Sequence, residues 1–98
     1  MTNKTIEIDG IAFRGTVLET AHAAILLIQG KSAHLGCGYF SLGPADKLGD
    51  RFAIVTGVKS FEDMLAAPVR GISREAAACG VETGMTGREA LLLMEAGE

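Results

Sequence analysis

The dipeptide Asp9-Gly10, placed between two alternating segments, is the feature that most limits how this chain folds. Apolar and polar residues alternate over residues 6–9 and again, up to the break at Leu18, over residues 11–17. A period of two is typical of a half-buried strand, and Asp-Gly favours a type I′ turn because both central residues need a positive φ. We therefore expect a β-hairpin, in which Gly15 marks either a bulge or a close approach to the backbone.

Three further strands follow in the sequence. Residues 23–28 are apolar without a break, as expected of a central strand with both faces buried. Residues 51–55 and 69–72 predict two more strands, and between them a helix begins after Ser60 and ends before Pro68. We expect this strand, helix and strand to form a right-handed βαβ unit.

Three other helices are indicated by their end signals: Pro in a first turn, Ser or Thr caps, and Gly after the last turn. They are bounded by Pro44 and Gly49, by Ser73 and Gly80, and by Thr86 and Ala96. Residues 29–42 show no regular pattern. The resulting order, β-β-β-α-β-α-β-α-α, predicts an α+β fold in which a mixed sheet packs on helices.

The size of the chain predicts one domain and favours self-association. Its 98 residues fit a single domain, with residues 1–29 as an N-terminal β region and residues 30–98 as an α/β part. Only five residues are aromatic and none is Trp, so the core must be aliphatic. Because so small a domain buries only about 60–65% of its unfolded surface, self-association would bury more.

Charge and hydropathy exclude several classes of protein. The net charge of −3 gives no basic surface for nucleic acid. The longest apolar run, residues 23–28, is far short of the roughly 20 residues that span a bilayer. Residues 1–9 lack the apolar region of a signal peptide. We therefore expect a cytoplasmic protein without a membrane or nucleic-acid partner, in which the two cysteines are reduced.

The segment Gly36-Cys37-Gly38 is a candidate for a catalytic thiol. Flanking glycines allow a ligand to approach the backbone closely, and His34 could lower the pKa of the Cys37 thiol or act as its base. The alternative is a small buried cysteine whose glycines permit tight packing, since free Cys is among the most buried residue types.

A metal site is not expected. His34 and Cys37 have a spacing that zinc ligands use, and His22 and Cys79 would complete a set of four. Nothing in the sequence brings the two pairs together. We expect neither a metal nor a cofactor.

Residues 56–60 form a candidate anion site, because they leave the carboxyl end of a predicted strand and enter a helix. A helix N-terminus offers free N–H groups and a partial positive charge. The candidate ligand-binding residues are Lys31, Gly36, Gly38, Thr56, Gly57, Lys59 and Ser60. Lys31 and Lys59 could share one pocket; the alternative is a well-capped helix and a solvated turn lysine.

Three motifs carry a resemblance to a known family: Leu35-Gly36-Cys37-Gly38-Tyr39-Phe40, Ile54-Val55-Thr56-Gly57-Val58-Lys59-Ser60-Phe61 and Gly84-Met85-Thr86-Gly87. They resemble the YunC-like family, small bacterial and archaeal domains of unknown function, and the similarity covers about residues 25 to 93. The resemblance implies an α+β domain whose N-terminal β region mediates tetramerisation. It implies no activity, cofactor or catalytic residue.

The sequence thus predicts a fold and an assembly but no reaction. We expect a homo-oligomeric binding module, a tetramer through its N-terminal strands, that binds a protein partner or a small ligand, for which an anion is one candidate. Two alternatives stay open. One is a small enzyme in which Cys37 is a nucleophilic or redox thiol assisted by His34 and Lys59, and the other is a purely structural subunit.

Overall fold

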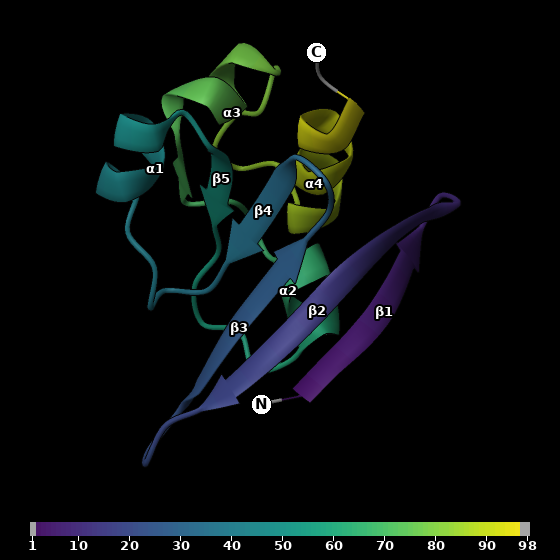
Figure 1. The fold of residues 1–98 in the computed structure, drawn as a ribbon, viewed down its shortest axis with the longest axis vertical. Coiled ribbons are helices and arrows are strands. Elements are labelled where there is room, and N and C mark those ends of the chain that lie inside the picture. Colours follow the sequence, from purple (N-terminus) through teal and green to yellow (C-terminus); the bar gives the residue numbers. More distant parts are fainter. Residues whose placement is uncertain (1, 97–98) are drawn as a thin grey trace.

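The computed structural model describes residues 2–96, and its six strands form one mixed sheet in sequential order (Figure 1). The strands are β1 (Thr2–Ile8), β2 (Ile11–Glu19), β3 (Ala24–Gln29), β4 (Ala33–Gly36), β5 (Arg51–Ile54) and β6 (Gly71–Ile72). The helices are α1 (Gly43–Leu48), α2 (Phe61–Ala66), α3 (Arg74–Ala78) and α4 (Gly87–Ala96). The predicted α+β class, a mixed sheet packed with helices, is confirmed.

The predicted hairpin forms with a two-residue turn. Asp9 and Gly10 have φ angles of 50° and 81°, and Ile8 pairs with Ile11 directly beside them. Positive φ at both central residues is the type I′ requirement, which the Asp-Gly dipeptide meets.

Gly15 marks a close approach and not a bulge. It keeps the regular register, pairing with Lys4 on one side and with Ile28 on the other. A Cβ at this position would lie 2.8 Å from Cζ of Phe61, so a larger residue would collide with α2. The absence of a side chain at Gly15 lets α2 pack on the sheet.

Strand β4 was not predicted, because it shows no contrast between a polar and an apolar face. Ala33 and Leu35 belong to the core, and Leu35 lies under the first residue of α4. His34 and Gly36 point to the opposite face, where Phe52 covers them. Both faces are therefore covered, and the two-residue alternation that identifies a half-buried strand is lost.

The predicted βαβ unit over residues 51–72 is wrong in its pairing, because β5 and β6 are antiparallel. The parallel pair is β4–β5, which α1 connects. Helix α2 stays near the carboxyl end of β5, since Met64 packs there against the start of α4 at Gly87. The chain therefore enters β6 from that same end, which makes the pairing antiparallel.

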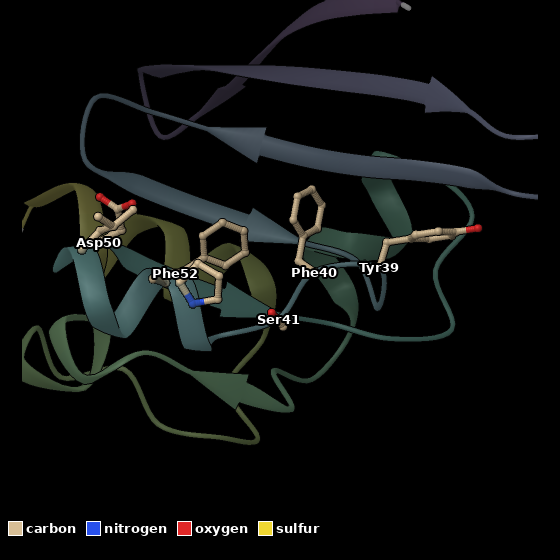
Figure 2. Close-up of a pocket in the computed structure, with 8 residues that line it drawn as sticks. Tyr39, Phe40, Ser41, Asp50 and Phe52 are labelled. Atoms are coloured by element: carbon tan, nitrogen blue, oxygen red, sulfur yellow. The ribbon is translucent and has the colours of Figure 1, made fainter.

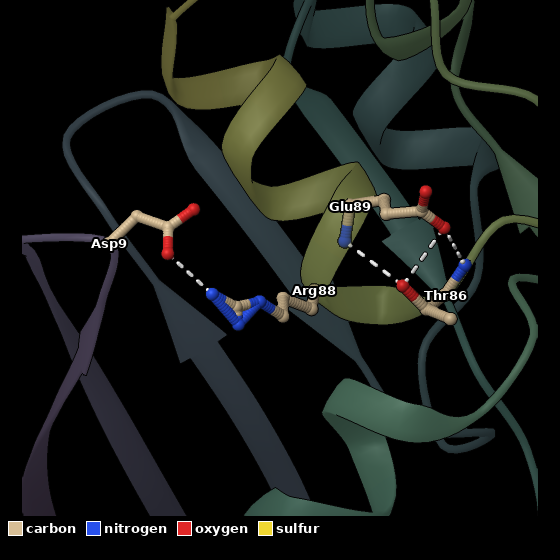
Figure 3. Close-up of polar contacts among 4 residues, drawn as sticks. All are labelled: Asp9, Thr86, Arg88 and Glu89. Atoms are coloured by element: carbon tan, nitrogen blue, oxygen red, sulfur yellow. Dashed lines mark hydrogen bonds and ion pairs between the residues drawn. The ribbon is translucent and has the colours of Figure 1, made fainter.

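The helix ends follow the capping signals of the sequence. Oγ of Ser60 accepts from the N–H of Asp63, and Gly49 and Gly80 have φ angles of 80° and 94° at the ends of α1 and α3. Thr86 and Glu89 form the reciprocal pair of a capping box at the start of α4 (Figure 3).

The core is aliphatic, as predicted, and Phe13 is the one ring in its fully buried cluster. Helix α4 contributes Ala90, Leu91 and Met94, all with no exposed surface. Within residues 2–96, no helix has both the length and the apolar character needed to cross a membrane.

Candidate functional site

The candidate binding residues fall at opposite ends of the parallel pair β4–β5. Because parallel strands share one carboxyl edge, the loops that follow β4 and β5 lie together. Gly38 and Thr56 meet there, since a Cβ on Gly38 would lie 3.5 Å from Cγ2 of Thr56. Lys31 precedes β4 at the amino end, so the structure does not bring it together with Lys59.

Cys37 is only 5% exposed and belongs to the aliphatic core. Its Sγ accepts from the N–H of Leu26 at 3.3 Å. His34 does not orient toward this thiol, because its ring stacks on Phe52 and its Nδ1 lies 3.0 Å from the carbonyl oxygen of Arg51. A reaction at Cys37 would therefore require local opening of the fold.

Cys37 and Cys79 are both free thiols. In the described part of the chain, no three His, Cys, Asp or Glu side chains are grouped in a way that could hold a metal ion.

The loop 56–60 forms the predicted cap of α2, and its own side chains occupy part of the helix N-terminus. Gly57 has a φ of 71° and no neighbour that a Cβ would meet. Ser60 accepts from the N–H of Asp63, while Oδ2 of Asp63 accepts from the N–H of Lys59 at 3.0 Å. Anion binding at Thr56, Gly57, Lys59 and Ser60 stays a prediction.

At Lys31, the chain supplies an anion of its own. The carboxylate of Glu95, in the last turn of α4, accepts from the N–H groups of Lys31, Ser32 and Ala33 at 2.8, 2.9 and 3.1 Å. Burial of the Glu95 carboxylate opposes ionisation, but these three bonds and the charge of Lys31 outweigh it and lower its pKa. Gly30 leaves room for the contact, because a Cβ there would lie 2.5 Å from Oε1.

A hollow beside α1, which we call the aromatic hollow, is the surface feature that sequence reasoning missed (Figure 2). Its volume is about 340 Å³. Most of its lining is apolar, and the larger apolar side chains are Tyr39, Phe40, Pro44, Leu48 and Phe52. Ser41 and Asp50 add polar groups, and Ala45 completes the wall.

The rings of the aromatic hollow are positioned by packing on β4 and β5. Phe52 and Phe40 lie 5.4 Å apart with their planes tilted by 47°, and His34 stacks on Phe52 in a parallel arrangement. Gly36 makes this possible, since a Cβ there would lie 2.5 Å from Cδ2 of Phe40 and 2.9 Å from Cε1 of Phe52. The candidate residue Gly36 thus leaves room for Phe40 and Phe52 to pack on β4, because it has no side chain.

One signal in the sequence points to this hollow. Three of the five aromatic residues fall between positions 39 and 52, although the core has almost none. Pro44 and Leu48 are four apart in the helix between them, which places both on one helical face. Aromatic residues gathered outside the core indicate a surface built to contact something else.

Comparison with known proteins agrees with the fold and gives no activity. The chain is 28% identical to the uncharacterised protein YunC of Bacillus subtilis over 99 aligned positions, covering 96% of this chain and 98% of that protein. A crystal structure of a protein of unknown function from Thermoplasma acidophilum matches with a TM-score of 0.90 and 31% identity, over 95% of this chain and 91% of the other. The model of the domain of unknown function DUF1805 matches residues 36–94, and the chain belongs to that family.

Proposed function

We propose that this chain is a cytoplasmic ligand-binding module that works as a homo-oligomer, and that a small molecule binds in the aromatic hollow. A volume of about 340 Å³ lies at the lower end of the range for small-molecule sites. The mixture of a largely apolar wall with a few polar groups is also typical of such sites. All the lining residues lie within the segment matched by the family model.

The observation that carries this proposal is the exposure of large apolar side chains at one place. Among the described residues, three large hydrophobic side chains are exposed, and two of them, Tyr39 at 57% and Leu48 at 76%, line the aromatic hollow. Single exposed hydrophobic residues are common and need no explanation. Two beside a hollow that already holds Phe40 and Phe52 form a patch that a ligand would remove from water.

Support for self-association comes from the outer face of the N-terminal sheet. Leu18 pairs with Ile25, and Thr16 with Leu27, on the face opposite the core residue Leu26. Leu18 is 48% exposed, and Ile25 and Leu27 are half-buried. Helix α2 packs on the other face of β2, at Gly15, and Figure 1 shows no helix of residues 2–96 in front of the β1–β3 ribbon, so this face is open to a second copy.

The binding proposal is tested by screening small aromatic and aliphatic compounds, neutral and charged, against ¹⁵N-labelled protein by NMR. We expect amide shifts concentrated in residues 39–52. Tyr39→Ala and Leu48→Ala remove exposed apolar surface from the aromatic hollow, so each should weaken binding about threefold to tenfold. Because both side chains are largely exposed, neither variant should lower the melting temperature by more than a few degrees.

Leu18→Ala is the matched control, since Leu18 is the third exposed large hydrophobic residue and lies on the N-terminal sheet. It should leave ligand affinity unchanged. Equal weakening by all three variants, or shifts confined to other parts of the chain, would contradict the proposal. A screen with no binder would favour the purely structural subunit.

A further inference from the structure

We infer that the ligand of the aromatic hollow is an organic cation, an ammonium or guanidinium group attached to a small apolar body. This inference rests on the proposed function and adds the charge of the ligand to it. Eight residues line the hollow, and Asp50 is the one that carries a charge. The wall therefore combines a carboxylate with aromatic rings, which is the chemistry that recognises organic cations.

Asp50 is fixed in the chain but its carboxylate is not engaged. Its N–H donates to the carbonyl oxygen of Ala45 at 2.9 Å, and its own carbonyl oxygen accepts from Oγ of Ser73 at 2.7 Å. No hydrogen bond or ion pair involves the Asp50 carboxylate among residues 2–96. Since the side chain is exposed at the rim, a ligand cation can reach it without displacing a protein group.

The direction of the chain places Asp50 beside the rings. Asp50 immediately precedes β5, and residues two apart in extended backbone point to the same side. Asp50 and Phe52 thus share one face, and Figure 2 shows Asp50, Phe52, Phe40 and Tyr39 following one another along the hollow.

Among residues 2–96, basic residues do not line the aromatic hollow; Lys31, His34 and Arg51 line a second hollow, which shares Asp50 with the first. Arg51 lies between Asp50 and Phe52 and points to the other face, where its guanidinium donates to the carbonyl oxygen of Met94 at 2.8 Å. Lys47 is in α1 but is not part of the lining. An anionic ligand would therefore meet a carboxylate and the negative faces of rings, both of which repel it.

The rings strengthen the same preference. A cation above an aromatic face within about 6 Å of its centroid is attracted by the ring quadrupole. His34 is stacked on Phe52, and Phe40 lies tilted beside it. The exposed ring of Tyr39 and the part of Phe52 that lines the hollow therefore remain for a ligand. A positively charged group between Asp50 and Phe52 (Figure 2) gains from both interactions, whereas a neutral ligand of the same shape gains from neither.

The test compares three probes of similar shape: benzylamine, which is a cation at pH 7, benzyl alcohol, which is neutral, and benzoate, which is an anion. Dissociation constants are measured by NMR titration of the full chain. We expect benzylamine to bind about fivefold more tightly than benzyl alcohol, and benzoate to bind more weakly than either. The advantage of benzylamine should shrink in 1 M salt, because exposed charges are screened there.

Asp50→Asn keeps the shape of the side chain. It should reduce the ratio of the dissociation constant of benzyl alcohol to that of benzylamine to near 1. Glu82→Gln removes the same charge from an exposed residue outside the hollow and should leave the ratio unchanged. Equal affinity for benzylamine and benzyl alcohol, or tighter binding of benzoate, would overturn the inference and leave the proposed function standing. Failure of all three probes and of the wider screen to bind would instead count against the proposed function.

Discussion

Ser73 shows how one buried side chain organises the candidate site. It is 1% exposed, and its Oγ accepts from the N–H groups of Phe52 and Ala76 at 2.9 and 3.2 Å while donating to the carbonyl oxygen of Asp50. Its role as the cap of α3 is visible in the sequence. Its bonds to Asp50 and Phe52 are not, because those residues are more than 20 positions away. One hydroxyl thereby fixes two residues of the aromatic hollow.

Ser73→Ala should lower the free energy of unfolding by about 3 kcal/mol, because three backbone groups, one in a buried and two in part-buried hydrogen bonds, lose their partner. Ser60→Ala removes an N-cap with a single bond, to the N–H of Asp63, and should cost about 1 kcal/mol. Urea unfolding of both variants measures the difference. Equal losses would mean that Ser73 acts only as a helix cap.

At the scale of elements, the hydrogen bonds of Glu95 attach the end of α4 to the turn between β3 and β4. Arg51 reinforces the junction by donating to the carbonyl oxygen of Met94 in the same helical turn. Two elements separated by more than 60 residues are joined at this point. An anionic ligand was predicted near Lys31, and the structure places the carboxylate of Glu95 there instead.

This junction predicts a pH dependence. Folding lowers the pKa of Glu95, so its contribution to stability is present above the pKa of the unfolded chain and is lost as pH falls through the folded value. At pH 7, Glu95→Gln should lower the free energy of unfolding by about 1 to 2 kcal/mol. The difference from the unmutated chain should shrink as pH falls through the lowered folded pKa of Glu95 and the carboxyl becomes protonated.

Urea unfolding between pH 3 and pH 7 measures this dependence, with Glu82→Gln as the control that removes an equal charge from an exposed residue without a side-chain partner among residues 2–96. If Glu95→Gln lowered the free energy of unfolding by the same amount at every pH, the shape of the Glu95 side chain, and not its charge, would hold the end of α4.

Elements with strong local signals were predicted well. The Asp9-Gly10 turn and the caps at Ser60 and Thr86 depend on residues within four positions of one another, and each is confirmed. Strand β4 and the antiparallel β6 depend instead on what covers them and on where α2 comes to lie. Neighbouring residues carry no information about such distant contacts.

At the scale of the whole molecule, the two exposed surfaces lie on one face of the sheet, because Leu27 pairs with Gly36, on which Phe40 and Phe52 pack. The aromatic hollow is beside α1, and the open face of the N-terminal sheet carries Leu18. The two surfaces adjoin at Leu27 and Gly36, so an assembly on this sheet face would lie beside the hollow.

We expect light scattering at micromolar concentration to give about four times the 10.2 kDa mass of one chain. Leu18→Lys places a charge on the open sheet face and should lower that mass, since burying an unpaired charge is costly. Leu48→Lys is the control, because Leu48 is more exposed but lies in the hollow, and it should leave the mass unchanged. A monomer for the unmutated chain would remove the assembly from the proposed function.

By itself the sequence determined the α+β class, the hairpin, the helix ends and an aliphatic core, because turns, caps and alternation depend on neighbouring residues. Only the tertiary structure decided that Cys37 is buried, that Lys31 and Lys59 lie at opposite ends of β4–β5, and that the rings of Phe40 and Phe52 meet above Gly36. These outcomes depend on which strands pair and which side chains cover them, and contacts between distant residues are set when the whole chain packs.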